Sequence, residues 1–244
     1  MYDLHCHVLP GIDDGARSLE EAIAMVTMSV DDGVKGLVVT PHVHPGRWDN
    51  TLTIIKDTLR QLREGLDQAE LSMEILCAGE VRLTDDILTM VAGGEMPYYG
   101  EVDDYRILLL EFPHGHIIPG SENLVDWLLA QHIRPMIAHP ERNKAVNRDP
   151  EAILPFVEKG CWLQLTANSV TGDFGAPAAR TSSWLLDRDL ATVVASDAHN
   201  TRYRTPRLSG AYETVVQQYG VTRADALFVA RPAKLFEAAK VLSF

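Results

Sequence analysis

Short apolar runs alternate with amphipathic helical segments from one end of the chain to the other. The helical segments carry recognisable start signals, such as the S-x-x-E capping box of Ser18 and Glu21 and the N1 proline of Asp149-Pro150. Strands joined through crossover helices run parallel in a sheet that those helices cover. The pattern therefore predicts one domain, residues 1–244, built on a parallel sheet that is either a barrel or doubly wound, with the strand order left open. The seven predicted strands are residues 2–5, 36–40, 73–78, 106–112, 135–138, 161–166 and 190–195.

Nearly every predicted strand is followed by a histidine or an acidic residue. The carboxyl ends of parallel strands in a barrel open on one face, so the side chains that follow them converge there. Imidazole and carboxylate together suit divalent zinc, manganese or iron, and the set is larger than one tetrahedral ion requires. The sequence therefore predicts a site for about two or three ions. The residues that follow the strands are His5, His7, His42, His44, Glu80, Glu111, His139, Asp197 and His199.

Other polar residues have an ordinary structural interpretation. The D-D-G segment of Asp13, Asp14 and Gly15 is by itself typical of a turn. His132 lies late in a predicted helix over residues 121–132, where an imidazole interacts with the helix dipole, and we do not expect it to bind a metal. Three further histidines lie beside predicted ligands and are candidates for contact with metal or substrate. They are His44, His114 and His116.

Composition narrows the class of protein. The net charge of −12, from 22 basic and 34 acidic residues, argues against a nucleic-acid binder or an anionic-membrane binder, and it leaves phosphate substrates open. The N-terminus lacks the basic and apolar regions of a signal peptide, and no apolar run reaches about 18 residues, so we expect neither export nor a membrane span. The three cysteines, Cys6, Cys77 and Cys161, form no C-x-x-C pair and fit small core residues in a reducing cytoplasm.

Several hydrolase chemistries are excluded by their missing motifs. No arginine stands six positions after any cysteine, so the C-x5-R loop of cysteine-dependent phosphatases is missing. The chain also lacks G-x-S-x-G, H-E-x-x-H and G-x-x-x-x-G-K-[ST]. Thiol-phosphate, serine-esterase, zincin and P-loop chemistries are therefore not expected.

At this point the motifs together resemble a known family. The resemblance is to the polymerase and histidinol phosphatase (PHP) superfamily and, within it, to the bacterial capsular and exopolysaccharide-type metal-dependent protein-tyrosine phosphatases. It implies a distorted (β/α)7 TIM-like barrel and three divalent ions, most often manganese, with iron and zinc as alternatives. The segments that carry it are His5-Cys6-His7 with the following L-P-G-I-D-D-G, T-P-His42, G-Glu80, L-Glu111-F, A-His139-P-E-R and A-S-Asp197-A-His199-N.

The resemblance also implies roles for individual residues. Arg142, in H-P-E-R, matches a phosphate-contacting arginine, with an ion pair to Glu141 or another carboxylate as the structural alternative. Arg204 resembles a second such arginine, but Arg202 and Arg207 lie too close in the sequence to be distinguished from it. The implied ligands form three sets, namely His5, His7 and Asp197 at the first ion, Glu111 and His139 at the second, and Asp14, His42 and His199 at the third, and Glu80 bridges the first ion to the second.

The implied activity is hydrolysis of phosphotyrosine on a protein substrate, expected to be a bacterial tyrosine kinase that regulates capsule or exopolysaccharide synthesis. A small-molecule phosphatase acting on histidinol phosphate or a sugar phosphate would have a similar site. A metal-binding partner of a polysaccharide-assembly kinase, without turnover, is a further alternative. The acidic net charge disfavours a nuclease. The natural substrate, the metal loaded in the cell and the oligomeric state are left open.

Overall fold

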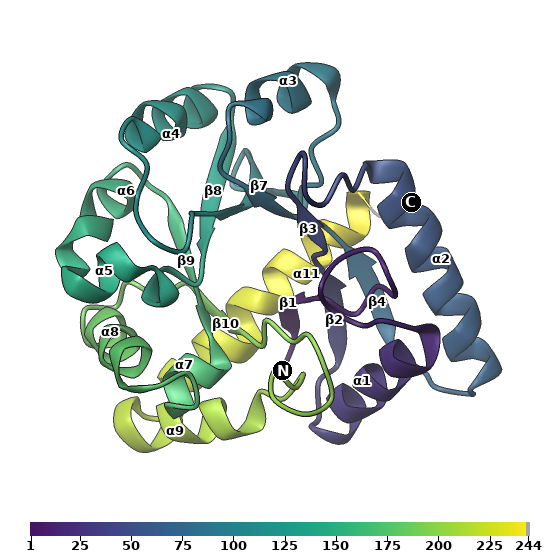
Figure 1. Ribbon diagram of the computed structural model, residues 1–244. Helices are drawn as coiled ribbons and strands as arrows, with labels where there is room; N and C mark the ends of the chain where they lie inside the picture. The colour runs from purple at the N-terminus through teal and green to yellow at the C-terminus, as the bar shows by residue number, and fades with distance from the viewer. Residues whose placement is uncertain (243–244) are drawn as a thin grey trace.

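The structure is a computed structural model that describes residues 1–242, and its strands are surrounded by helices (Figure 1). All seven predicted strands are present, and their ends differ from the predicted ends by three residues or fewer. Neighbouring strands pair in parallel, as predicted. The seven strands are β1 (Asp3–Cys6), β2 (Gly36–Val39), β4 (Glu74–Cys77), β7 (Tyr105–Glu111), β8 (Ile133–Ala138), β9 (Trp162–Thr166) and β10 (Val193–Ala195).

Two of these strands bend and continue in a second sheet. The first sheet has the order β1-β2-β4, and the second has the order β10-β9-β8-β7-β5-β3. After the bends, β2 continues as β3 (His42–Val43) and β4 continues as β5 (Glu80–Arg82). Glycine is required at the second bend, because a Cβ atom on Gly79 would lie 2.4 Å from Cγ of Pro97. His42 and Glu80 therefore begin the short strands that follow the two bends.

The first and last strands meet through a short pairing. The amide of Asp197, just after β10, donates to the carbonyl of His5 at 2.7 Å, and the amide of His7 donates to the carbonyl of Ala198 at 2.8 Å. Cys6 and Ala198 form an isolated parallel bridge between them. With this seam the strands follow the predicted distorted (β/α)7 TIM-like arrangement, in which two bends and a short seam replace a continuous ladder.

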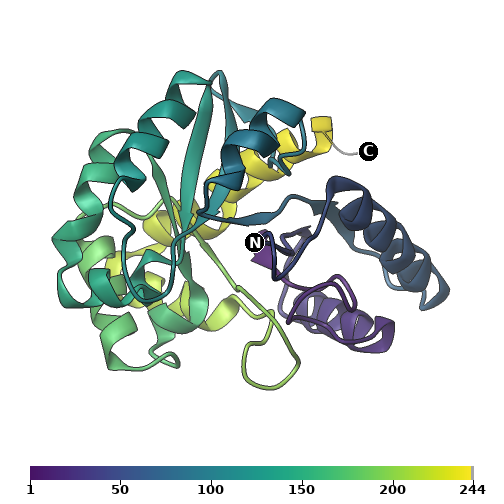
Figure 2. The same ribbon diagram turned by 45° about the horizontal axis from the view of Figure 1, so that its top comes forward.

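Helices cover the outside of the strands (Figure 2). The predicted capping box is confirmed in one half at the first helix, where the amide of Glu21 donates to Oγ of Ser18 at 3.3 Å, while the Glu21 carboxylate accepts from the Arg17 amide at 3.1 Å. The helix predicted at Asp149-Pro150 begins as a 3-10 turn, η2 (Pro150–Ile153), and continues as α6 (Leu154–Glu158). The other predicted helices are α1 (Leu19–Asp31), α2 (Leu52–Gln68), α4 (Ser121–Ala130) and α8 (Ala176–Asp187), with α9 (Ser209–Tyr219), α10 (Val221–Asp225), the π-helical turn η3 (Ala226–Ala230) and α11 (Arg231–Leu242) in the helical last part of the chain.

Some elements were not predicted, and one helix ends earlier than predicted. His132 lies beyond the end of α4 with φ of 56°, so the prediction that it lies within the helix was wrong. Besides the short strands β3 and β5, the elements that the sequence did not indicate are α3 (Asp86–Gly93), α5 (Lys144–Arg148), α7 (Ala167–Thr171), the 3-10 turn η1 (Pro140–Arg142) and β6 (Glu101–Val102), which pairs antiparallel with β7.

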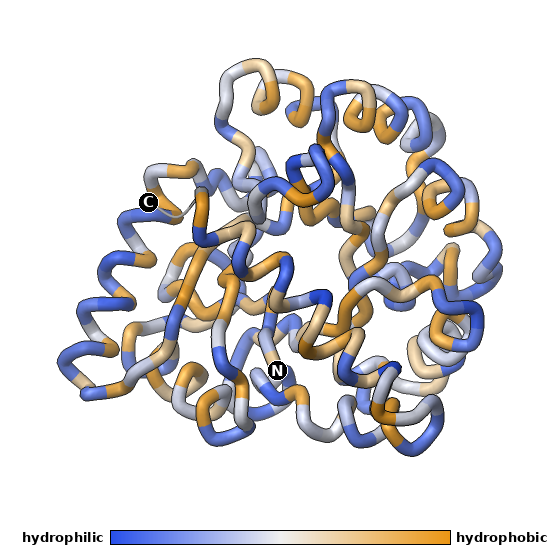
Figure 3. The backbone as a smooth tube through the Cα atoms, turned by 180° about the vertical axis from the view of Figure 1, so that it is seen from behind, coloured by the Kyte–Doolittle hydropathy of each residue, from blue (hydrophilic) through white to orange (hydrophobic). Residues whose placement is uncertain are grey.

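The core lies between the strands and their helices. The strand segments are largely hydrophobic, whereas α2 alternates between hydrophobic and hydrophilic residues along its length (Figure 3). The last helix, α11, crosses behind β1, β2 and β4, where the Phe236 ring lies 5.0 Å from the Tyr2 ring. Among residues 1–242, no helix is both long and apolar enough to cross a bilayer. The carboxyl ends of the strands stay free of α11 and carry the polar residues described next.

Candidate metal centre

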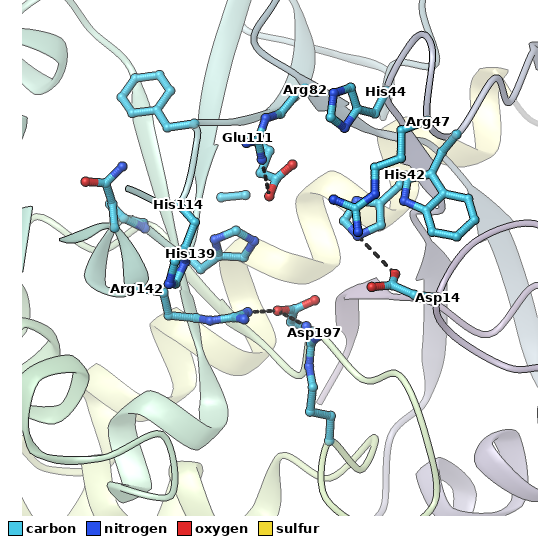
Figure 4. Close-up of a pocket in the computed structure, with 16 residues that line it drawn as sticks. Asp14, His42, His44, Arg47, Arg82, Glu111, His114, His139, Arg142 and Asp197 are labelled. Carbon is cyan, nitrogen blue, oxygen red and sulfur yellow. Dashed lines mark hydrogen bonds and ion pairs between the residues drawn. The ribbon is translucent and has the colours of Figure 1, made fainter. Parts of the chain in front are cut away.

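The nine predicted ligands come together at the carboxyl ends of the strands. Figure 4 shows Asp14, His42, Glu111, His139 and Asp197 around one cavity. They form four overlapping groups, and within each group one ligand atom per residue lies within 4.8 Å of the others. Most members are buried, so their charges and lone pairs cannot be satisfied by bulk water. The groups are His7, Asp14, His42 and His199; His5, His7 and Glu80; His5, His139 and Asp197; and His42, Glu80 and Glu111.

The imidazoles of His5 and His7 face each other in an arrangement that suits a shared cation. Nδ1 of His5 lies 2.8 Å from Oε1 of Gln164, whose amide orientation is set because its Nε2 donates to the Leu165 carbonyl at 2.7 Å. Nδ1 of His7 lies 2.8 Å from a carboxylate oxygen of Asp13, which can only accept. Both Nδ1 atoms therefore carry hydrogen, so each Nε2 presents a lone pair whenever its ring is neutral. Burial opposes a charge on these rings, but nearby carboxylates raise the pKa of both, so a positive charge, either a proton or a metal ion, is favoured at the Nε2 atoms.

These two Nε2 atoms are only 3.2 Å apart. Two lone pairs cannot bond to each other, and two N–H groups in their place would repel. Two nitrogen ligands that each lie about 2.0–2.1 Å from one ion are separated by roughly 3.3 Å in tetrahedral geometry. The arrangement therefore fits a metal ion between the two imidazoles. The other ring nitrogens, Nδ1 of His5 and of His7, contact Gln164 and Asp13, and such contacts orient histidine ligands of metal ions.

Glu80 lies at the middle of the cluster and is completely buried. Its Oε1 is 2.7 Å from Nε2 of His139, and its Oε2 is 2.9 Å from Nδ1 of His42. The same Oε2 lies 3.3 Å and 3.4 Å from Nε2 of His7 and of His5, yet it has no hydrogen-bond partner among the described residues. Burial alone would raise the pKa of Glu80, but the surrounding imidazoles hold it well below its usual range. The ionised carboxylate thus contacts imidazoles from several groups.

Asp197 has one oxygen facing the imidazoles and one facing arginines. Its Oδ1 lies 3.4 Å from Nε2 of both His5 and His7 and has no hydrogen-bond partner in the described part of the chain. Its Oδ2 contacts Nη1 of Arg142 and lies 2.5 Å from Nη2 of Arg204. Although burial opposes ionisation, Arg204 and the other nearby cations hold the pKa of Asp197 well below its usual range. An unpartnered buried carboxylate oxygen is a position at which a cation fits.

Two residues of the cluster have a strained backbone conformation. His139 has φ of 33° and Asp197 has φ of 51°, both in the left-handed region. Such a conformation costs a non-glycine residue on the order of 1 kcal/mol, and it persists only where the surroundings hold it. Asp197 is held by the seam to β1 and by Ser196, whose Oγ donates to Oδ2 of Asp3 at 2.5 Å. Two predicted ligands are therefore fixed in strained positions.

His199 and His42 both approach Asp14 but differ in charge. Burial and the charge of His7 lower the pKa of His199 to about 4, so its ring is neutral. Its Nδ1 faces the Asp197 carbonyl at 3.0 Å, while its buried Nε2 has no hydrogen-bond partner in the described structure and lies 3.4 Å from Oδ1 of Asp14. Burial opposes protonation of His42, but Glu80 raises its pKa to about 9. His199 thus presents a free lone pair beside a carboxylate.

The arginines lie at the edge of the cluster, in a cavity of about 220 Å³. Of the three arginines that the sequence could not distinguish, Arg204 lines this cavity, whereas Arg202 and Arg207 are exposed and lie outside its lining. Arg142 lines it too and is paired with Asp197 (Figure 4). The structural alternative is therefore met in part, since Arg142 pairs with a carboxylate, but that carboxylate is Asp197 and not Glu141, which is buried and accepts from the Thr166 amide at 2.8 Å.

Three further residues complete the outline of this cavity. Glu111 lies in a group with His42 and Glu80, and its Oε1 is paired with Nη1 of Arg82 at 2.9 Å. His44 and His114 line the cavity without joining any group of ligands found in the described residues. His116 does not line it. The cavity is therefore lined by both arginines and carboxylates, namely Arg47, Arg82, Arg142 and Arg204 with Asp14, Glu111 and Asp197.

The family assignment rests on comparison with known proteins. The family described as capsular polysaccharide synthesis, CpsB/CapC, matches residues 1–237. The chain belongs to the CpsB/CapC family. It is 31% identical over 220 residues to the tyrosine-protein phosphatase YwqE of Bacillus subtilis, covering 90% of this chain and 85% of YwqE. It is 30% identical over 244 residues to the tyrosine-protein phosphatase CpsB of Streptococcus pneumoniae, covering 96% of this chain and 98% of CpsB.

A solved structure agrees with this assignment. The crystal structures of YwqE from Bacillus subtilis and CpsB from Streptococcus pneumoniae, described as unique metal-dependent tyrosine phosphatases, match with a TM-score of 0.85 at 30% identity. The match covers 99% of this chain and 94% of the other. The predicted resemblance to the capsular and exopolysaccharide-type group is thereby confirmed.

In this CpsB/CapC protein, sequence analysis missed the residues that orient the predicted ligands. Asp13 caps the D-D-G bend, as a turn aspartate does, through a 2.9 Å bond from the Gly15 amide, and its other oxygen also holds His7. Gln164 is a fully buried amide in β9, whose neighbours are apolar. A polar residue inside an apolar strand was the signal that could have identified Gln164. Arg82, which pairs with the predicted ligand Glu111, has no comparable signal in the sequence.

Proposed function

We propose that this CpsB/CapC protein is a metal-dependent phosphatase that hydrolyses phosphotyrosine on a protein, in particular on a bacterial tyrosine kinase that regulates capsule or exopolysaccharide synthesis. The observation that carries the proposal is the pairing of two arginines with a buried cluster of imidazoles and carboxylates in one cavity. A cluster without the arginines would suit metal binding alone. The relatives named tyrosine-protein phosphatases support the substrate class. The three free cysteines fit a reducing compartment such as the cytoplasm.

We assign the nine clustered residues as ligands for three divalent ions, with manganese as the expected metal. The unpartnered buried atoms of Glu80, Asp197 and His199 and the facing Nε2 atoms of His5 and His7 support this assignment. A mixed set of imidazole and carboxylate donors suits manganese, iron or zinc. When bound, the ions supply Lewis acidity toward phosphoryl oxygens and lower the pKa of water.

The chain's own residues would bind and orient the phosphate. A guanidinium has several N–H donors in a fixed fork, and the contacts of Arg142 and Arg204 with Asp197 leave others to face the cavity. The Nε of Arg204 is buried without a hydrogen-bond partner in the described residues. Arg142 is further steadied by the ring of Phe174, 4.7 Å from its guanidinium carbon. Such preorganised donors stabilise the charge that develops on the transferring oxygens.

The nature of the leaving group favours tyrosine over serine. The phenol of tyrosine has a pKa of about 10, so phenolate leaves far more readily than a serine alkoxide and asks less of a protein acid. His199, with its pKa lowered to about 4, does not hold a proton that it could give at neutral pH. His42, whose pKa Glu80 raises to about 9, also lines the cavity, but both histidines are assigned as metal ligands, so the preference for tyrosine rests on the leaving group.

Turnover on three substrates tests the proposal. Protein reconstituted with manganese would be assayed on a phosphotyrosine peptide, the matching phosphoserine peptide and histidinol phosphate. We expect the phosphotyrosine peptide to have the highest kcat/KM. A higher kcat/KM for histidinol phosphate would identify a small-molecule phosphatase, and no turnover of any of the three would favour a binding protein.

A matched pair of variants tests the metal assignment in the same assay. Glu80→Gln removes the charge at the centre of the cluster, whereas Glu64→Gln makes the same change at an exposed position on α2. We expect Glu80→Gln to lose bound metal, measured by elemental analysis, and turnover with it. Glu64→Gln should retain both. A Glu80→Gln protein with its full metal content and turnover would show that the ligand assignment is wrong.

A further inference from the structure

A second cavity adjoins the candidate metal centre. Its volume is about 660 Å³, and it shares Arg142 and His114 with the cavity of the metal centre. Figure 4 shows both shared residues on the same side of that first cavity, with Arg142 reaching across to Asp197. Phe174, Pro177 and Ala178 give the second cavity an apolar part. The arginine assigned to the phosphate is therefore also a wall of the neighbouring space.

Three of the cations that line the second cavity have no acidic partner. Lys144 and Arg148 of α5 and Arg180 of α8 are exposed and line it, and none of the three forms an ion pair or a side-chain hydrogen bond within residues 1–242. No carboxylate is among its lining residues. The protein as a whole has a net charge of −12, so this local group of unpaired cations differs in sign from the rest of the molecule. Such a group favours an anionic ligand.

The nearby acidic residues are engaged elsewhere. Asp149 caps η2, where its Oδ1 accepts from the Glu151 amide at 3.2 Å. Asp173 accepts from Oγ1 of Thr171 at 2.6 Å. Neither residue lines the second cavity. The charges of Lys144, Arg148 and Arg180 are therefore not neutralised by the acidic side chains next to them in sequence.

We propose that this second cavity is a subsite that binds acidic side chains flanking the phosphotyrosine of the protein substrate. The inference rests on the proposed function, because the phosphotyrosine must occupy the cavity beside Arg142. A peptide anchored there passes over Phe174, which stacks on Arg142, before it reaches Arg148 and Arg180. Carboxylates pair with guanidinium groups in a planar, bidentate way, and the apolar part accommodates the stem of a glutamate. The subsite thus selects substrate segments rich in aspartate or glutamate.

Two peptides and two charge-matched double variants test this subsite. The peptides share a phosphotyrosine sequence and differ only in having glutamates or glutamines on both sides of it. One protein carries Arg148→Gln and Arg180→Gln. The control carries Arg60→Gln and Arg188→Gln, which remove the same charge at exposed positions outside the lining of either cavity. The readout is the ratio of kcat/KM for the glutamate peptide to that for the glutamine peptide.

We expect the wild type to prefer the glutamate peptide and the subsite variant to lose that preference by about 2- to 30-fold, the range for two exposed ion pairs. The control should keep the wild-type ratio. The wild-type ratio should also fall as ionic strength rises from about 0.01 M to about 1 M, because exposed pairs are screened. The salt series tests the inference even if the double variant fails to fold.

The outcomes separate this inference from the proposed function. Turnover of neither peptide by the metal-loaded wild type would overturn both. Equal turnover of the two peptides, or an equal loss of preference in the control, would overturn the acidic subsite and leave the phosphatase proposal in place. A ratio that is unaffected by salt and by the subsite variant would also overturn it.

Discussion

Replacing Asp13 by asparagine tests whether the contacts behind the imidazoles matter to metal binding. The Asp13 carboxylate accepts from three donors, and all three lie at or beside predicted ligands. Oδ2 accepts from Nδ1 of His7 at 2.8 Å and from the His42 amide at 3.0 Å, while Oδ1 accepts from the Gly15 amide at 2.9 Å. Asparagine has one oxygen and one NH2 group, so in either orientation its NH2 group faces a donor.

The size of the effect follows from these contacts. A hydrogen bond to a charged group contributes about 1.5–3 kcal/mol. Loss of a residue that orients a metal-bound histidine lowers metal affinity or activity by about 10- to 100-fold, which corresponds to about 1.4–2.7 kcal/mol. The two ranges agree. We therefore expect Asp13→Asn to raise the dissociation constant of the most affected ion by about 10- to 100-fold.

Competition with a metal chelator would measure this affinity, and turnover at limiting and at excess manganese would accompany it. Excess metal should restore part of the lost turnover, because the ligand atoms themselves remain. Asp103→Asn is the control, since Asp103 is exposed and paired with Lys234 far from the cluster. If Asp13→Asn bound metal as tightly as the wild type and kept full turnover at limiting manganese, the proposed role of Asp13 would be refuted.

Three further predictions concern the metals, the phosphate and the thiols. Chelation should abolish turnover and manganese should restore it, and full turnover in protein shown by elemental analysis to be metal-free would contradict this. Arg142→Ala should lower kcat/KM by about 10- to 1,000-fold while metal content is retained. Arg142→Lys should recover only part of the lost kcat/KM. An Arg142→Ala protein with normal turnover and normal inhibition by phosphate would show that the role of Arg142 is structural alone. Burial raises the pKa of Cys161 to about 12 and that of Cys6 well above its usual range. Because a thiol is protonated below its pKa, only about 0.01% of Cys161 is thiolate at about pH 8. Iodoacetamide at that pH should leave turnover intact, and stoichiometric inactivation of folded, metal-loaded protein would argue for a catalytic cysteine.

The main strands could be predicted because they are buried on both faces. Residues such as Leu108, Leu109 and Leu110 are fully buried whichever way they point, so the strand forms a continuous apolar run. The short strands β3 and β5 left no such signal. They begin just after Pro41 and Gly79, which indicate the end of a strand, and their pairing depends on neighbouring strands more than on their own residues.

The candidate site was predictable in its residue types and not in its detailed grouping. Parallel strands bring their carboxyl ends to one face, which accounts for the convergence of His5, Glu80 and Asp197. Which ligands share an ion depends on side-chain directions that a sequence does not specify. The assignment of His139 to an ion with Glu111 stays a prediction, since its Nε2 is 2.7 Å from Glu80 and the ring also lies in a group with His5 and Asp197.

The seam between β1 and the segment after β10 has a consequence for the order in which the protein matures. During synthesis from the N-terminus, the group of His5, His7 and Glu80 has all its members once residue 80 has emerged. The group that contains His199 lacks a member until residue 199 has emerged. The pairing of His5 and His7 with residues 197–198 closes a loop of about 190 residues, and contacts so distant in sequence form slowly. If the assigned residues bind metal as proposed, we expect the site to be complete only after residue 199 has been synthesised and β1 has paired with the segment after β10.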